Sequence, residues 1–295
     1  MDMDWTERIN GALAYVEQHL DGEIDLERMA RVAGCSVYNF QRLFSFVADK
    51  PLSQYIRERR LTLAAFDVVR TEERLIDIAL RYGYESQDAF ARAFRAYHGV
   101  LPSAARSGPV TLRSCPRLIF RRETKEDTGM NYRVEEWPAF TVAGFRTRMR
   151  TDEVFARAPG LWKEAWGDGR IKALHALFMQ ADYRPEGYLG VAAGGRWSEE
   201  GMVDYYMGVT TWVDVPEVAR IQTPQGMERL DMPAATWVIL EANGEPGVAM
   251  QQAYKAFYGE WLPQSGYVPA DVPVLESYMM EGRQNIWIAV EKVGE

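Results

Sequence analysis

The chain has 295 residues, of which 47% are apolar and 26% are charged, so it has room for two folded domains and is not an intrinsically disordered polymer. Its 2 cysteines and 3 histidines are scattered, which excludes a disulfide framework and a recognisable metal-ligand motif. Because it has neither a long apolar run nor an N-terminal signal pattern, we expect a cytoplasmic protein with no membrane partner, metal or cofactor.

The net charge of −8 is unevenly distributed. Residues 1–122 contain 18 lysines and arginines against 16 acidic residues, whereas residues 123–295 contain 16 against 26. All but one of the cations in the first part are arginine, which binds phosphate and guanine through two hydrogen bonds. Any DNA binding is therefore expected in the first part, with modest affinity and strong salt sensitivity. The acidic second part would attract cations.

The first part is predicted to be helical throughout. Apolar residues recur at helical spacing in several segments, and Gly, Pro or Asp residues separate one segment from the next. The expected helices span residues 3–20, 25–33, 36–47, 52–70, 75–82 and 86–97.

The segment 36–47 has two distinct faces. One is apolar, and the opposite one carries side chains of the kinds that read base edges in a DNA major groove, namely Tyr38, Gln41, Arg42 and Ser45. Ser36 is a suitable N-cap because its hydroxyl can accept hydrogen bonds from free backbone N–H groups. The alternative interpretation is an ordinary amphipathic surface helix.

A second copy of this helix lies 50 residues further on, so that Phe40 corresponds to Phe90 and Arg42 to Arg92. Each copy follows a short helix and a glycine, Gly34 or Gly83. A helix, a tight glycine turn and a second helix with a polar face predict a helix-turn-helix unit, and the chain has two. In the second unit the outward face carries Asp88, Ala91, Arg92 and Arg95, and Ser86 takes the place of Ser36.

Residues 5–106 resemble the DNA-binding domain of AraC/XylS-type transcription regulators. The segments that carry the resemblance are DLERMARVAGCSVYNFQRLF, PLSQYIRERRLTLAAFDVV and LIDIALRYGYESQDAFARAFRAYHGVLPSAAR. It implies that a long middle helix holds two recognition helices one turn of double-stranded DNA apart, so that both enter the major groove. By position, the resemblance makes the groove readers Tyr38, Gln41 and Arg42 in the first unit and Gln87, Ala91 and Arg92 in the second, and with Ser86 and Arg95 these are the candidate DNA contacts of the second unit. Asp88 and Ala91 depart from the usual polar pattern, so the first unit is expected to specify sequence more tightly than the second. Arg57, Arg59 and Arg60 of the middle helix either contact phosphates or form a solvated face.

Residues 107–130 are interpreted as a linker, with one strand at 118–121. Beyond it, alternation predicts a strand pair at 132–136 and 140–145, a helix at 158–175, and strands at 187–193 and 204–213. A repeat at an offset of 95 residues relates Pro138 to Pro233 and Trp166 to Trp261. Two copies of a strand–strand–helix unit predict an α+β domain with pseudo-twofold symmetry and a groove at the junction.

This half, roughly residues 130–293, resembles the GyrI-like effector-binding domains, through the repeat and the segments YYMGVTTWV, AYKAFYGEWLPQSGY and DVPVLESYMM. The resemblance implies that Glu276 lies in the central groove and meets the ligand. Tyr278 shares its face of the strand. A carboxylate walled by aromatic rings suits a flat organic cation. The candidate walls, each with core packing as the alternative, are Trp162, Trp166, Tyr206, Trp212, Tyr258 and Trp261.

The sequence therefore predicts a multidomain protein, with an all-α tandem helix-turn-helix domain at 1–106, a linker at 107–130, and a pseudo-twofold α+β domain of duplicated ββα type at 131–295. The favoured function is a bacterial transcription regulator that binds DNA and senses a small amphipathic effector, with organic cations as one candidate class and RNA polymerase as a candidate partner. It is not expected to be an enzyme. Two alternatives remain open: a small-molecule hydrolase that uses Glu276 and a groove tyrosine, and a constitutive DNA binder with a vestigial second domain.

Overall fold

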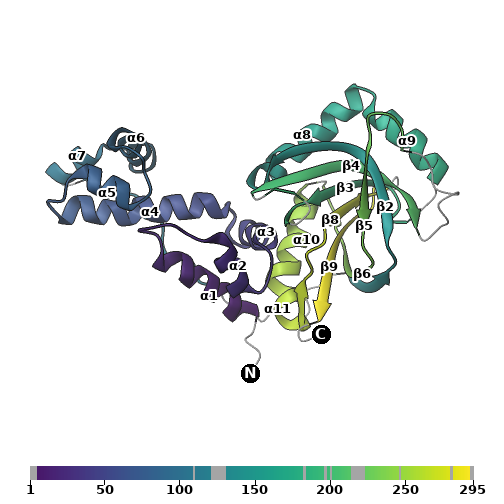
Figure 1. Cartoon of the computed structure of the whole chain (residues 1–295), viewed down its shortest axis with the longest axis horizontal. Helices are drawn as coiled ribbons and strands as arrows, with labels where there is room; N and C mark the ends of the chain where they lie inside the picture. The colour runs from purple at the N-terminus through teal and green to yellow at the C-terminus, as the bar shows by residue number, and fades with distance from the viewer. Residues whose placement is uncertain are drawn as a thin grey trace. The chain divides into compact units, whose positions relative to one another are not determined.

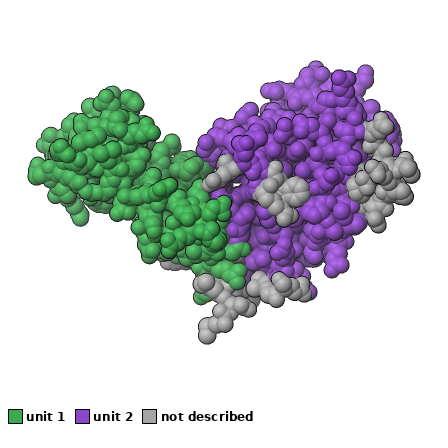
Figure 2. All heavy atoms as spheres, viewed as in Figure 1, with its two compact units in different colours: residues 1–34, 48–121 green, residues 35–47, 122–295 purple. Residues whose placement is uncertain are grey.

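The computed structural model describes residues 5–108, 110–120, 131–181, 184–195, 198–199, 201–213, 223–245, 247–279 and 282–292. The chain forms two compact units (Figure 2). Unit 1 comprises residues 1–34 and 48–121, and unit 2 comprises residues 35–47 and 122–295. Within the described ranges, no helix is long and apolar enough to cross a membrane.

Unit 1 is helical, and its helices lie within two residues of the predicted bounds. A further short helix, α7, follows them. The helices, which Figure 1 labels, are α1 (Trp5–Gln18), α2 (Leu26–Ala33), α4 (Leu52–Arg70), α5 (Leu75–Arg81), α6 (Gln87–His98) and α7 (Pro102–Ser107). The strand predicted at 118–121 is wrong for its described part, because residues 118–120 belong to no strand of the sheet. That segment is held by side chains: the amide of Asn10 donates to the carbonyl of Phe120 at 2.8 Å.

The predicted turns are confirmed. α2 begins at Asp25, whose carboxylate accepts a hydrogen bond from the Arg28 N–H at 2.9 Å, and it ends at Gly34, where φ is 72°. The corresponding glycine of the second repeat, Gly83, has a φ of 79°. Both glycines have left-handed backbones, which other residues adopt only at a cost in free energy. The glycine turn of each repeat is therefore required by backbone geometry.

The helix α4 packs on α5, α6 and α7 through Leu61, Ala65 and Val68. Phe66 and Val69 of the same helix are about half exposed, so its apolar surface extends beyond the part that these three helices cover.

The arginines of α4 are mostly used inside unit 1. Arg59 forms an ion pair with Glu17 at 2.6 Å, and both side chains are about nine-tenths buried. Arg60 donates to the carbonyl of Leu20 at 2.9 Å. Of Arg57, Arg59 and Arg60, only Arg57 is exposed. Neither a solvated face nor a set of phosphate contacts therefore describes all three arginines.

Unit 2 is built on a nine-stranded antiparallel sheet whose order is β1-β6-β9-β8-β3-β4-β2-β5, with β7 paired to β9. Its strands are β1 (Tyr132–Trp137), β2 (Phe140–Arg150), β3 (Tyr188–Ala193), β4 (Met202–Val213), β5 (Glu228–Met232), β6 (Ala235–Glu241), β7 (Tyr267–Pro269), β8 (Val274–Tyr278) and β9 (Gln284–Lys292). Its helices are α3 (Val37–Ala48), α8 (Val154–Gly167), α9 (Arg170–Ala181), α10 (Val248–Ala256), the π-helical turn η4 (Phe257–Trp261) and α11 (Leu262–Ser265); one further turn, η1, spans Thr151–Glu153.

The strand order is symmetric. In the strand order, β1 corresponds to β5, β2 to β6, β3 to β8 and β4 to β9, because each pair lies at equal distances from the middle of the sheet. A pseudo-twofold axis therefore lies between β3 and β8. The strands on either side of each proline turn do not pair with each other, which corrects the predicted strand pair: β1 pairs with β6, and β2 pairs with β4 and β5. The first strand of each repeat thus pairs with the second strand of the other repeat.

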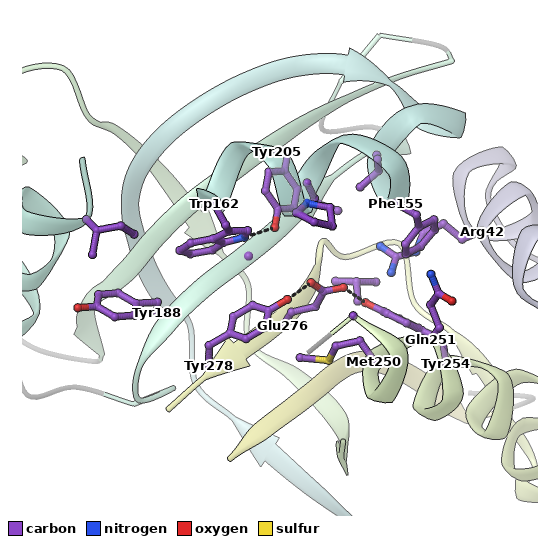
Figure 3. Close-up of a pocket in the computed structure, with 18 of the residues that line it drawn as sticks. Arg42, Phe155, Trp162, Tyr188, Tyr205, Met250, Gln251, Tyr254, Glu276 and Tyr278 are labelled. Atoms are coloured by element: carbon purple, nitrogen blue, oxygen red, sulfur yellow. Dashed lines mark hydrogen bonds between the residues drawn. The ribbon is translucent and has the colours of Figure 1, made fainter. Parts of the chain in front are cut away.

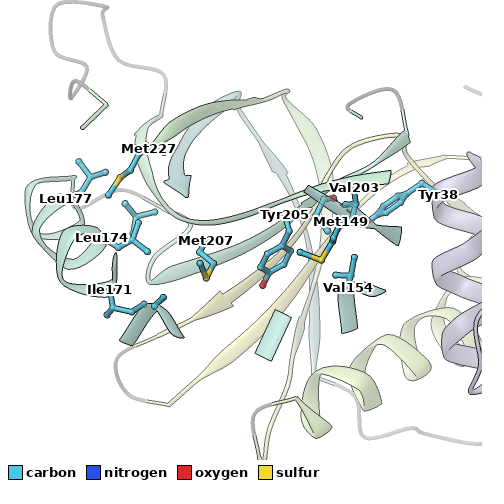
Figure 4. Packing of buried hydrophobic residues seen from close by; sticks show 14 residues of the cluster. Tyr38, Met149, Val154, Ile171, Leu174, Leu177, Val203, Tyr205, Met207 and Met227 are labelled. Carbon is cyan, nitrogen blue, oxygen red and sulfur yellow. Dashed lines mark hydrogen bonds between the residues drawn. The ribbon is translucent and has the colours of Figure 1, made fainter. Parts of the chain in front are cut away.

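The helix predicted at 158–175 is interrupted. α8 ends at Gly167, and α9 starts at Arg170 after Gly169, where φ is 91°. α9 packs on β4 and buries Leu174 and Leu177 against Met207 of that strand, as Figure 4 shows. The opposite face of the sheet carries a second core that includes Trp237, Trp287 and Tyr206.

Candidate functional site

The helix α3, which sequence analysis assigned to DNA, is part of unit 2. Tyr38 and Arg42 are only 6% and 4% exposed, so the prediction that both lie on an outward face is wrong for this structure. The Tyr38 hydroxyl donates to the carbonyl of Ala192 in β3 at 3.3 Å, and its ring lies where a Cβ on Gly194 would be. Helical periodicity identifies one buried face but not a second partner on the other side.

Arg42 is a buried cation held by aromatic rings. Its guanidinium donates to the Tyr38 hydroxyl at 2.7 Å and lies 4.7 Å from the centre of the Tyr254 ring and 5.7 Å from that of Phe155. Within the described residues it forms no ion pair, and its Nε atom has no hydrogen-bond partner. An arginine stays protonated inside a protein, so a positive charge is buried here with ring faces as its main compensation.

Phe46, one helical turn further along α3, continues the same contact. Its ring stacks on Tyr254 with a centroid distance of 4.3 Å and meets Phe155 edge-on at 4.6 Å. α3 is thus anchored to α8 and α10 by aromatic contacts from two successive turns.

A cavity of about 360 Å³ lies beside these contacts, within unit 2 (Figure 3). Its wall comes from α3, α8, α9, α10 and strands β3, β4 and β8, and most of it is apolar or aromatic. Among the described residues that line it, only Arg42 and Glu276 carry a charge. A cavity of this size and composition suits a small amphipathic molecule.

Glu276 lies at the centre of the sheet, paired with Gly190 across the pseudo-twofold axis. Its carboxylate accepts hydrogen bonds from the hydroxyls of Tyr278 at 2.8 Å and Tyr254 at 3.1 Å. Burial, together with the neighbouring carboxylate, raises the pKa of Tyr278 well above its usual value, so this phenol stays protonated and donates. No cation forms an ion pair with Glu276 within the described residues.

Trp162 and Tyr205 form the other side of the cavity. The Trp162 indole N–H donates to the Tyr205 hydroxyl at 2.9 Å, and the Trp162 ring lies 5.6 Å from that of Tyr278. Gly190 makes room for this pair, because a Cβ there would lie 2.5 Å from the Tyr205 hydroxyl oxygen.

Four of the predicted ligand residues line this cavity: Glu276, Tyr278, Trp162 and Trp166. Tyr206 does not, because alternation along β4 turns it to the opposite core and brings Tyr205 to the cavity instead. Tyr258 and Trp261 are buried in η4 away from it. The side chain of Trp212 lies outside the described residues.

Several residues of the cavity wall were not predicted from the sequence. The aromatic ones are Phe155, Tyr188, Tyr205 and Tyr254. Tyr254 had a signal, since it lies one turn before Tyr258 on a helix already considered. Tyr205 had one as well, because either tyrosine of the pair at 205–206 could have faced the groove, and only the strand register decides which.

The polar face of α6 is open to solvent. Ser86 caps the helix by accepting a hydrogen bond from the Ala89 N–H at 3.1 Å, and Gln87, Arg92 and Arg95 are exposed. Neither arginine forms an ion pair within the described residues. In α3, Ser36 accepts from the Asn39 N–H at 3.2 Å as a cap, while Gln41 and Ser45 are half-buried.

Comparison with known families matches both parts of the chain. The model of the GyrI-like small-molecule-binding domain matches residues 130–291, and that of a helix-turn-helix domain matches residues 29–108. The regulatory protein SoxS of Escherichia coli is 38% identical over 95 residues, 32% of this chain and 89% of SoxS.

The chain belongs to the AraC family of transcription regulators and carries a GyrI-like small-molecule-binding domain.

Other relatives of this regulator divide between its two halves. The HTH-type transcriptional activator AarP of Providencia stuartii is 38% identical over 98 residues, 33% of this chain and 73% of AarP. The solved structure of SAV2435 bound to tetraphenylphosphonium covers 55% of this chain and 94% of its own, with 17% identity and a TM-score of 0.45. The region matched by the helix-turn-helix model contains α3 and α6, and the region matched by the GyrI-like model contains every residue named in the cavity wall except Arg42.

Proposed function

We propose that this regulator binds a small amphipathic organic cation in the cavity beside Glu276, and that the bound cation changes its affinity for DNA. One observation carries the proposal: Glu276 is held by two tyrosine hydroxyls at the edge of an aromatic cavity and lacks an ion-pair partner within the described residues. A carboxylate removed from water without a cation is costly. A ligand that brought the missing positive charge and stacked on Trp162 would offset that cost.

The first test is calorimetric titration of the full chain with tetraphenylphosphonium, a large apolar cation, and with triphenylphosphine oxide, a neutral molecule of similar shape. The Glu276→Gln change keeps the size of the side chain and removes its charge. We expect it to weaken binding of the cation at least tenfold, about 1.4 kcal/mol or more, and to leave the neutral compound unaffected. Glu245→Gln, at an exposed glutamate that does not line the cavity, is the matched control.

Equal affinity of the Glu276→Gln and wild-type chains for the cation would refute the proposed role of Glu276. Stronger binding of the neutral compound than of the cation would refute the proposed ligand class.

For DNA, we propose that α6 contacts the duplex through Ser86, Gln87, Arg92 and Arg95, which are free to do so in unit 1. Ser36, Tyr38, Gln41, Arg42 and Ser45 remain the proposed contacts of α3 once that helix leaves unit 2. We also propose a cytoplasmic location, domain boundaries at 1–106, 107–130 and 131–295, and RNA polymerase as a candidate partner. Gel-shift titration with duplexes enriched by the full chain from a random library tests the DNA contacts.

The hydrogen bond between Tyr278 and Glu276 favours a second candidate function, hydrolysis of a reactive small molecule by a general acid and base. A Glu276→Gln chain that still binds a reactive substrate but no longer turns it over would support that function. The absence of turnover in the wild-type chain would support the sensor alone.

A further inference from the structure

The cavity holds two opposite charges that do not meet. Arg42 reaches it from α3 and Glu276 from β8, and within the described residues neither forms an ion pair. Tyr254 contacts both: the guanidinium lies over its ring at 4.7 Å, and its hydroxyl donates to the carboxylate at 3.1 Å. Arg42 thus lies on the face of the same tyrosine ring whose hydroxyl contacts Glu276, as Figure 3 shows.

We propose that Arg42 is an internal competitor of the cationic ligand, so that an organic cation in the cavity expels α3 from unit 2 and frees its polar face for DNA. The inference rests on the proposed function, because it requires a cationic ligand. It adds the route by which binding at the cavity reaches the DNA-binding residues. Tyr38, Gln41 and Arg42 are unavailable or half-buried while α3 stays in place.

Electrostatics sets the sign of the coupling. One carboxylate can compensate one nearby positive charge, and a second cation in the same low-dielectric cavity repels the first. The cavity therefore binds a ligand cation more weakly while Arg42 is buried in it than after α3 is released. A ligand shifts an equilibrium by its differential affinity for the two states, so the released state gains population.

The ends of α3 suit such a movement. The helix is preceded by Gly34, with φ at 72°, and followed by Asp49, with φ at 53°, and these residues adjoin the points where the chain passes between the two units. Asp49 is the only residue other than glycine with a positive φ among those that the structure describes. A change of backbone conformation at these two positions would reorient the helix without unwinding it.

The helix also carries a natural reporter of its position. Cys35 lies two residues before α3 in unit 2. Its side chain is half-buried, and burial raises the pKa of its thiol to about 12. The only other cysteine, Cys115, is in unit 1 and can be replaced by serine to leave a single thiol. Alkylation needs the thiolate, so a rise in the labelling rate at pH 8 reports that the environment of Cys35 has opened to water.

The experiment measures iodoacetamide labelling of the Cys115→Ser chain with and without saturating tetraphenylphosphonium, and with triphenylphosphine oxide as the neutral control. We expect the cation to speed labelling of Cys35 at least fivefold and the neutral compound to leave it unchanged. Phe46→Ala removes the ring stacked on Tyr254 without altering the charge in the cavity. It should give fast labelling without any ligand, with the far-ultraviolet circular dichroism spectrum retained.

A second measurement addresses the charge itself. Arg42→Gln should bind tetraphenylphosphonium about tenfold more tightly than the wild-type chain, whereas Arg229→Gln, on β5 away from the cavity, should not. If the wild-type chain binds the cation but labelling and Arg42→Gln affinity stay unchanged, the competition is refuted while the proposed function stands. If no chain binds the cation, the proposed ligand class is refuted and the competition with it.

Discussion

The guanidinium of Arg42 lies over the ring of Tyr254, and the hydroxyl of the same tyrosine donates to Glu276. One aromatic side chain therefore connects a helix expected to read DNA with a carboxylate expected to meet an effector. Arg42 lines the cavity, so the helix proposed to bind DNA and the site proposed to bind the effector share a residue.

Tyr254→Phe keeps the ring that Arg42 and Phe46 contact and removes the hydroxyl that donates to Glu276. Loss of a hydrogen bond to a charged group should lower the stability of unit 2 by about 1.5–3 kcal/mol. The matched control is Tyr258→Phe, since the buried Tyr258 hydroxyl has no partner within the described residues. Thermal unfolding of both variants should show a lower Tm for Tyr254→Phe only. An equal loss in the two would mean that the hydrogen bond to Glu276 contributes nothing.

Gly190→Ala tests how tightly the cavity floor is packed. The new Cβ would lie 2.5 Å from the Tyr205 hydroxyl, so that ring must move and its hydrogen bond to Trp162 must stretch. We expect a destabilisation of about 1–3 kcal/mol and weaker binding of organic cations. Gly160→Ala, in α8, meets nothing within 4 Å and should be tolerated. Unchanged stability and affinity in Gly190→Ala would show that Tyr205 adapts freely.

The ion pair of Glu17 with Arg59 predicts a pH dependence in unit 1. Burial alone would raise the pKa of Glu17, but hydrogen bonds from Arg59 and Tyr55 outweigh it and hold that pKa below the ordinary value of 4.5. Because the folded-state pKa is depressed, the stabilisation is fully present above pH 4.5 and is lost as the pH falls through the lower, folded value.

Glu17→Gln should therefore reduce the stability of α1 and α4 by about 2 kcal/mol near neutral pH and by progressively less in acid. Amide hydrogen exchange of these helices measures the difference. A gap between wild type and variant that is independent of pH would contradict an electrostatic origin.

Arg92→Ala removes an exposed cation from the face of α6 that is free in unit 1. If this residue contacts DNA, the change should cost about 1–3 kcal/mol of binding. A loss confined to particular duplexes would indicate a base contact, and a uniform loss with a smaller salt slope would indicate a phosphate contact. Arg184→Ala in unit 2, with the same change in net charge, should leave binding intact. If Arg92→Ala and Arg184→Ala weaken DNA binding equally, Arg92 acts only through the net charge of the protein and makes no specific contact.

Several features could be predicted from the sequence because they are local. The long helix 52–70 and both glycine turns follow from periodicity and from the left-handed backbone at Gly34 and Gly83. The shared face of Glu276 and Tyr278 follows from alternation along one strand. The repeat of 95 residues led to the pseudo-twofold sheet, whose strand order has that symmetry.

Other features depend on partners far away in the chain, which periodicity does not reveal. A polar helical face that contains a tyrosine and an arginine looks the same whether it faces DNA or aromatic rings, so the burial of Tyr38 and Arg42 was not predicted. The choice of Tyr205 over Tyr206 depends on which face of β4 looks toward α8. Strand pairing across the repeats, such as β1 with β6, requires knowledge of the whole sheet.

The most direct test of the account is the affinity of the full chain for a duplex that it has itself enriched from a random library, measured by fluorescence anisotropy with and without saturating tetraphenylphosphonium at fixed ionic strength. The account predicts that the cation tightens DNA binding about tenfold and that, by linkage, the duplex tightens cation binding by the same factor. Identical DNA affinities in the two conditions, with the cation bound, would contradict it.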